Sequence, residues 1–110
     1  NYIEWLKGDY DIECVSNLIK PLRELKKISP DIILMDINLS EDKDYFYIID
    51  EIKKEIKLRT ALIIIITKKY NEDDVVSGLE KGACDYVKKP VGQNELKARI
   101  KNLLRFFIDI

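Results

Sequence analysis

Three polar residues, Asp36, Thr67 and Lys89, stand at or directly after apolar runs that read as β-strands. These runs cover residues 32–35, 62–66 and 84–87. The three side chains supply a carboxylate, which is a usable nucleophile at neutral pH, a hydroxyl and an ammonium group. If the strands are parallel, their carboxyl ends meet at one edge of a sheet, and we expect the three groups to converge there. A simpler reading of Asp36 is an aspartate that caps a loop.

The segments around these strands have the spacing of amphipathic helices. Apolar residues recur at helical intervals around residues 22–28, 48–56, 75–79 and 96–107. Ile56, Val76 and Leu79 are among the residues that mark the apolar faces of these helices. A further apolar stretch over residues 11–15 reads as another strand. Strands that alternate with helices predict an α/β fold, a doubly wound parallel sheet with helices on both faces.

Residues that start and stop helices agree with this alternation. Pro21 suits the first turn of a helix, Asn71 can cap the helix around residues 75–79, and Gly82 can end it. In such sheets the functional crevice lies at the carboxyl ends of the strands. The sequence therefore directs the search for chemistry to Asp36, Thr67 and Lys89.

The composition sets limits on the class of protein. With 110 residues, 46% of them hydrophobic, the chain fits one compact domain. Because 19 basic residues nearly balance 20 acidic ones, we expect no direct binding to nucleic acid or to a membrane surface. Cys14 and Cys84 lack the spacing of a zinc or redox motif, and the longest apolar run is far shorter than the roughly 20 residues of a membrane-spanning helix. We expect a soluble, cytoplasmic protein.

Three motifs in order give the chain a specific resemblance. PDIILMDI at residues 30–37, IIIIT at 63–67 and GACDYVKKP at 82–90 resemble successive motifs of response-regulator receiver domains of two-component signalling. The resemblance implies a flavodoxin-like (CheY-like) sheet and covers nearly the whole chain. It places the receiver domain at residues 1–105, with 106–110 as the end of the last helix or the start of a linker to an output domain.

The same resemblance implies roles for the strand-end residues. Asp36 would take a phosphoryl group from a sensor histidine kinase or a phosphotransfer protein. Lys89 would pair with Asp36 and then with a phosphoryl oxygen, although Lys88 beside it is a competing candidate. Thr67 would donate its hydroxyl to the phosphoryl group. The peptide before Pro90 is usually cis in the family.

Tyr86, three residues before Lys89, matches the aromatic switch residue of receiver domains. By resemblance, Thr67 would move toward the phosphoryl group while Tyr86 turns inward behind it. The alternative for Tyr86 is a ring that fills space at a strand edge.

The chain departs from the family pattern at its beginning. Receiver domains normally begin with a strand that ends in two acidic residues which help to hold Mg²⁺, and nothing before Asp11 resembles it. Residues 1–7 look instead like the end of the first helix, so the first strand is expected to be absent, exposing its apolar neighbours. For magnesium, the resemblance leaves the Asp36 carboxylate and the backbone carbonyl of Asn38, which would bind the ion weakly.

Three functions remain open at this stage. The first is a phosphorylation-controlled switch of a protein-interaction surface, without enzymatic activity. The second is a pseudo-receiver, a phosphorylation-independent docking or dimerisation module. The third, a flavodoxin-like small-ligand enzyme, is disfavoured because the strand-to-helix loops lack a phosphate-cradling glycine series. An output domain and a homodimer are both compatible with the sequence.

Overall fold

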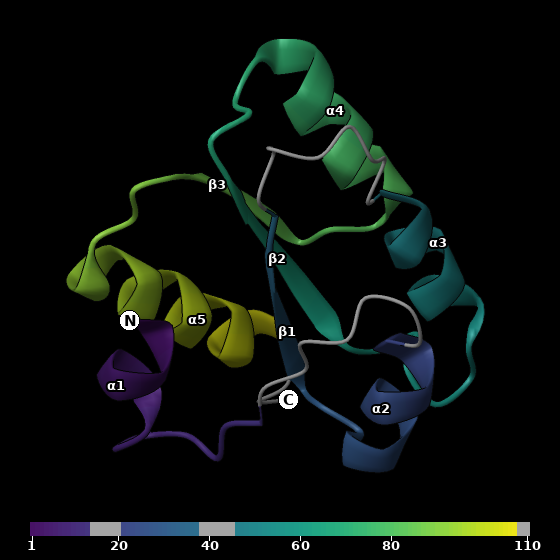
Figure 1. Cartoon of the computed structure of the whole chain (residues 1–110), viewed down its shortest axis with the longest axis horizontal. Helices are drawn as coiled ribbons and strands as arrows, with labels where there is room; N and C mark the ends of the chain where they lie inside the picture. The colour runs from purple at the N-terminus through teal and green to yellow at the C-terminus, as the bar shows by residue number, and fades with distance from the viewer. Residues whose placement is uncertain (14–20, 38–45, 108–110) are drawn as a thin grey trace.

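The computed structural model describes residues 1–13, 21–37 and 46–107 as a sheet of parallel strands between two layers of helices (Figure 1). The elements, in chain order, are α1 (Tyr2–Leu6), α2 (Pro21–Ile28), β1 (Ile32–Asp36), α3 (Phe46–Lys54), β2 (Leu62–Thr67), α4 (Glu72–Lys81), β3 (Asp85–Lys88) and α5 (Gln93–Phe107). Each of the three strands expected around the polar residues is present, within one residue of its predicted bounds.

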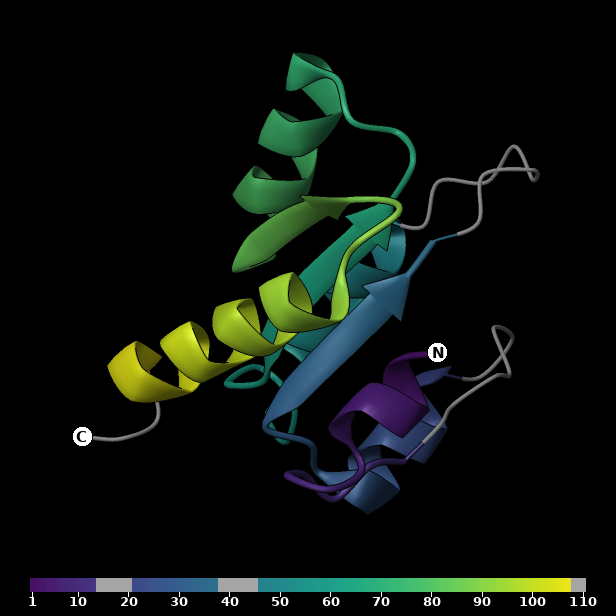
Figure 2. The same cartoon turned by 90° about the vertical axis from the view of Figure 1, so that its left-hand side faces the viewer.

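The strands pair in the order β1-β2-β3, and both pairs are parallel. The arrowheads of β1 and β2 therefore point to the same end of the sheet (Figure 2). In the register of the sheet, Ile32 lies opposite Leu62 and Ile64 lies opposite Asp85. Parallel strands joined by helices confirm the predicted α/β architecture.

The core lies on both faces of the central strand β2, whose six residues are all buried. Successive side chains of a strand point to opposite faces. Ile63 and Ile65 pack in the cluster beneath α2, α3 and α4, whereas Ile64 and Ile66 pack in the cluster beneath α1 and α5. Figure 1 shows α1 and α5 on one side of the sheet and the other three helices on the opposite side. A strand with two buried faces explains the unbroken apolar run of its sequence.

The strand β1 is apolar like β2 but is much less buried. Its first four residues, Ile32 to Met35, are only partly buried, and its last residue is exposed. In the described part of the chain, β1 pairs with β2 alone, so its other edge has no strand beside it. The exposure expected for the neighbours of a missing first strand is therefore seen at β1.

The strand predicted over residues 11–15 is not found where it can be assessed. Residues 11–13 have no regular secondary structure, and 14–15 lie outside the described residues. Ile12 does pack against the cluster beneath α1 and α5. Apolar spacing can place a side chain in the core, but a strand also needs a hydrogen-bonded neighbour, which spacing cannot supply.

The predicted helix boundaries hold closely. Pro21 begins α2, and the side chain of Asn71 caps α4 by accepting a 2.9 Å hydrogen bond from the backbone N–H of Asp74. Gly82 ends α4 with φ 125°, a left-handed conformation that favours glycine. The helix α5 ends at Phe107, and residues 108–110, the rest of the segment predicted as a helix end or linker, lie outside the described residues. No helix in the described ranges is both long enough and apolar enough to cross a membrane.

Three residues predicted to lie on apolar helix faces are exposed instead. Ile56 follows the end of α3 and is 75% exposed, and Val76 and Leu79 are 44% and 43% exposed on α4. The face of α4 that meets the sheet carries Val75 and the buried Gly78. Of the three apolar residues predicted on this face, Val75 packs against the core and Val76 and Leu79 do not, and the buried Gly78 gives no hydrophobic signal.

Candidate functional site

The three polar residues singled out by the sequence converge at one edge of the sheet. Asp36 ends β1, Thr67 ends β2, and Lys89 follows β3. The backbone N–H of Lys89 donates a 2.9 Å hydrogen bond to the carbonyl oxygen of Thr67, and the N–H of Ile37 donates one of the same length to Ile66. These hydrogen bonds align the carboxyl ends of the neighbouring strands, as expected for a parallel sheet.

Asp36 and Lys89 form an ion pair between Oδ1 and Nζ at this edge. The Lys89 ammonium group also donates a 3.3 Å hydrogen bond to the carbonyl oxygen of Ile37. Their side chains are 46% and 19% exposed, so solvent reaches the carboxylate while the lysine is mostly enclosed. Lys88 is exposed and Lys89 is the residue that reaches Asp36, which resolves the ambiguity between them. The peptide between Lys89 and Pro90 is cis.

Thr67 is 1% exposed, and its hydroxyl faces the turn that follows β2. The Oγ1 atom accepts a 3.1 Å hydrogen bond from the backbone N–H of Lys69. A hydroxyl that accepts one hydrogen bond can still donate its own proton to an anionic oxygen. Thr67 is thus a buried donor beside Lys89, with its backbone fixed by the sheet.

Tyr86 is 5% exposed and lies inward, against α4. Its hydroxyl donates a 2.7 Å hydrogen bond to the carbonyl oxygen of Lys69. Its ring is tilted by 56° to that of Tyr70, with the ring centroids 5.7 Å apart. An inward, hydrogen-bonded ring fits the predicted position of a switch residue as well as that of a space-filling aromatic.

Lys69 links Thr67 to Tyr86, a role that the sequence reasoning missed. Its backbone N–H donates to the Thr67 hydroxyl, and its carbonyl oxygen accepts from the Tyr86 hydroxyl. A residue two positions after a threonine often bonds to the threonine hydroxyl, so the first contact had a local signal. The second contact joins residues 17 positions apart and depends on the fold.

Burial raises the pKa of the Tyr86 hydroxyl to about 12, with smaller contributions from the negative charge of Asp74 and from Tyr70. The ordinary pKa of tyrosine is 10.0. Since the unfolded chain loses this proton first, the folded state binds more protons between these two values. The stability that this group contributes is complete below about pH 10 and is lost as pH rises to about 12.

An alkaline titration followed by phenolate absorbance tests this environment. We expect the protein with Tyr86→Phe to lack the component that ionises with a midpoint of about 12. If the component that the variant loses instead has a midpoint near the ordinary tyrosine pKa of about 10, the Tyr86 hydroxyl is hydrated rather than buried.

The described residues supply few ligands for a metal ion at this edge. No group of three or more His, Cys, Asp or Glu side chains in residues 1–13, 21–37 and 46–107 is placed to hold a metal. Asn38, whose backbone carbonyl was the second expected ligand, lies outside the described residues. Asp36 is therefore the one predicted magnesium ligand whose position is known.

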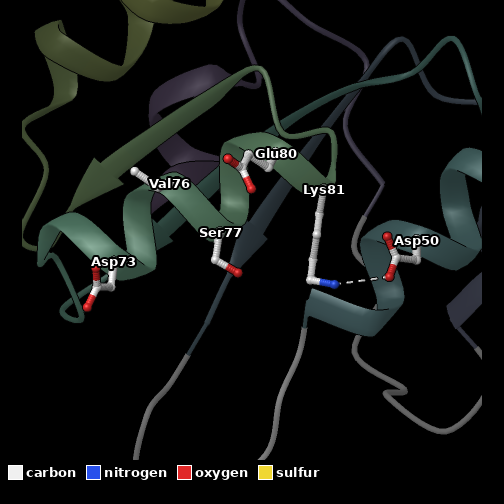
Figure 3. Close-up of a pocket in the computed structure, with 6 residues that line it drawn as sticks. All are labelled: Asp50, Asp73, Val76, Ser77, Glu80 and Lys81. Carbon is white, nitrogen blue, oxygen red and sulfur yellow. Dashed lines mark hydrogen bonds and ion pairs between the residues drawn. The ribbon is translucent and has the colours of Figure 1, made fainter.

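A depression of about 590 Å³ between α3 and α4 is separate from this edge (Figure 3). Its lining residues are Asp50, Asp73, Val76, Ser77, Glu80 and Lys81. Lys81 points across it to Asp50, at 3.2 Å between Nζ and Oδ2. Sites for small ligands are mostly apolar with a few polar groups, whereas charged side chains dominate here. The depression gives no support to a small-ligand enzyme.

Comparison with known proteins assigns the chain to a family. The sequence profile described as the response regulator receiver domain matches residues 1–101. The chain belongs to this family. It is a receiver domain of two-component signalling, as the three motifs indicated.

Solved structures support the same assignment. The N-terminal domain of the nisin resistance regulator NsrR, a lantibiotic response regulator, has a TM-score of 0.78 and 33% identity over 94% of this chain and 85% of that chain. The receiver domain of a signal transduction histidine kinase from Syntrophus aciditrophicus has a TM-score of 0.78 and 29% identity over 98% and 82%. A two-component response regulator from Clostridium difficile has a TM-score of 0.84 and 22% identity over 97% and 86%. The last of these shows the CheY-like fold.

Receiver domains as a class interact with histidine kinases or phosphotransfer proteins. They generally bind Mg²⁺ at the phosphorylation site.

Proposed function

We propose that this receiver domain accepts a phosphoryl group on Asp36 from a phosphohistidine of a kinase or phosphotransfer protein in the cytoplasm. A carboxylate oxygen of Asp36 attacks phosphorus and forms a P–O bond, while the P–N bond to the donor imidazole breaks. The imidazole nitrogen leaves with the bonding electron pair and takes up a proton. The product is an aspartyl phosphate, with no oxidant or further reactant needed.

The observation that carries this proposal is the ion pair between Asp36 and Lys89 at the carboxyl edge of the sheet. In phosphoryl transfer, negative charge spreads over the peripheral oxygens, so fixed cations and donors matter more than a strong base. Lys89 is held by Asp36 and by the Ile37 carbonyl, and is ready to pair with a phosphoryl oxygen. The half-exposed Asp36 leaves room for a donor to approach.

The switch that we propose runs from Thr67 through Lys69 to Tyr86. A phosphoryl group on Asp36 attracts the Thr67 hydroxyl. Because that hydroxyl is hydrogen-bonded to the Lys69 N–H, and the Lys69 carbonyl to the Tyr86 hydroxyl, its movement shifts the Lys69 backbone and the partner of Tyr86. Tyr86 lies against α4, where Val76 and Leu79 are 44% and 43% exposed. We propose the surface of α4 and α5 as the one that changes partners, such as an output domain or a second copy of the chain.

Magnesium fits the described residues only in part. Mg²⁺ takes about six oxygen ligands in octahedral geometry, and Asp36 provides one carboxylate. The described residues do not complete such a site, and no step of the proposed transfer runs through the ion. The second candidate is a pseudo-receiver that docks or dimerises without phosphorylation.

Incubation with a small acyl phosphodonor in a magnesium-containing buffer, followed by intact-mass measurement, separates these two functions. We expect the protein to gain one phosphoryl group and the Asp36→Asn variant to gain none. The matched control is Asp31→Asn, an exposed aspartate just before β1, which should be phosphorylated like the unaltered protein. A protein that is folded by circular dichroism but stays unmodified would contradict the phosphoacceptor and support the pseudo-receiver.

A further inference from the structure

The ring of Tyr86 occupies space that only a glycine at position 78 leaves free. A Cβ added at Gly78 would lie 2.9 Å from the Cδ2 and Cε2 atoms of Tyr86 and 3.0 Å from the Cδ1 atom of Ile65. Non-bonded carbon atoms prefer separations of about 3.5–4.0 Å. The ring, the strand β2 and the helix α4 are therefore too close for even an alanine at this position without a shift.

The backbone of α4 gives no separate reason for a glycine there. Gly78 lies inside the helix, and Gly82 is the described glycine with a positive φ. Inside a helix, alanine is favoured over glycine by about two- to fivefold in the folding equilibrium constant. A glycine at position 78 thus weakens α4, and its compensating effect is the close contact with Tyr86.

The hydroxyl end of Tyr86 is also tied to α4. Lys69, whose carbonyl oxygen accepts from Tyr86, pairs through Nζ with Oδ1 of Asp74 at 3.5 Å. Asp74 lies in the first turn of α4, where Asn71 caps its backbone. The Asp74 side chain is only 16% exposed, whereas that of Lys69 is 55% exposed, so the carboxylate end of this pair is the sheltered one. Both ends of the tyrosine are held by one helix, the ring at Gly78 and the hydroxyl through Lys69.

We infer that Gly78 is a positioning residue that holds Tyr86 inward, so that the residue at this position controls the link from Thr67 through Lys69 to α4. A larger side chain at position 78 drives the ring outward and breaks the hydrogen bond to Lys69. The inward position of the Tyr86 ring follows from its contacts with Gly78 and Lys69 alone. Only its use in signalling rests on the proposed phosphorylation of Asp36.

The inference is tested by a double-mutant cycle between positions 78 and 86, measured by urea unfolding without any phosphodonor. In the native background, we expect Gly78→Ala to lower the folding equilibrium constant. In the Tyr86→Val background, which lacks the ring atoms and leaves space into which the Cδ1 atom of Ile65 can move, the same change should raise it, by up to about two- to fivefold. Ser77→Ala, one residue earlier in α4, should have the same effect in both backgrounds. If Tyr86→Val does not fold, Tyr86→Leu replaces it.

A second measurement follows the ring itself. Tyr86 should be nitrated by tetranitromethane several-fold faster in Gly78→Ala than in the native protein, because its ring leaves the buried position against α4. Peptide mass mapping measures the extent of nitration. Tyr47, which is 56% exposed on α3, should react equally in both proteins. An equal effect of Gly78→Ala in both backgrounds, or unchanged nitration of Tyr86 in the folded variant, would overturn the inference. Both results are obtained on unphosphorylated protein, so a failure of the proposed phosphorylation would leave them intact.

Discussion

Replacing Lys89 with glutamine is expected to slow phosphorylation of Asp36 by about 100- to 1000-fold. This is the usual loss of rate when one preorganised donor that stabilises negative charge in the transition state is removed. The ammonium group contacts the Asp36 carboxylate and is only 19% exposed. Glutamine is close to lysine in length and keeps hydrogen-bonding ability but lacks the charge. The rate is measured from the growth of the phosphorylated species in intact-mass time courses.

Lys88→Gln is the matched control, since it changes the neighbouring lysine in the same way. Lys88 is exposed at the end of β3. Its replacement should leave the rate of phosphorylation nearly unchanged. Equal losses in the two variants would show that general positive charge, rather than the specific ion pair, assists the transfer.

Replacing Ile64 with alanine is expected to lower the free energy of unfolding by about 4 kcal/mol. Ile64 is fully buried in the middle of β2, in the cluster beneath α1 and α5. The loss combines the transfer free energy of the removed methyl and methylene groups with the cavity that they leave. Urea unfolding measures it, and Ile64→Val, with an expected loss of about 1 kcal/mol, remains measurable if the alanine variant is too unstable.

Ile56→Ala is the control for this change, because Ile56 is 75% exposed after the end of α3. Its effect should stay within about 0.5 kcal/mol, as for most surface substitutions. A similar loss at both positions would contradict the assignment of β2 as the buried centre of the sheet.

Local patterns were sufficient to predict the three strands of the described sheet and the convergence of the site. The apolar runs around residues 32–35, 62–66 and 84–87 became β1, β2 and β3, and their ends brought Asp36, Lys89 and Thr67 together. These features depend on short stretches of sequence and on the geometry that parallel strands share. The order of three family motifs supplied the rest of the fold.

What the sequence could not predict depends on contacts between distant segments. Lys69 joins Thr67 to Tyr86 through its backbone, which any residue type can do. The packing face of α4 was only partly predicted, through Val75, because Gly78, the residue that admits Tyr86, carries no side chain to mark it. The strand predicted over residues 11–15 likewise lacked information on a pairing partner.

The central claim, that Asp36 is the phosphoacceptor, is tested most directly by locating the phosphoryl group. Borohydride reduces an aspartyl phosphate to homoserine, and peptide mass mapping then identifies the modified position. We predict homoserine at position 36 in phosphodonor-treated protein and none in untreated protein. Homoserine at another aspartate, or a stable phosphate on a hydroxyl side chain, would contradict the account.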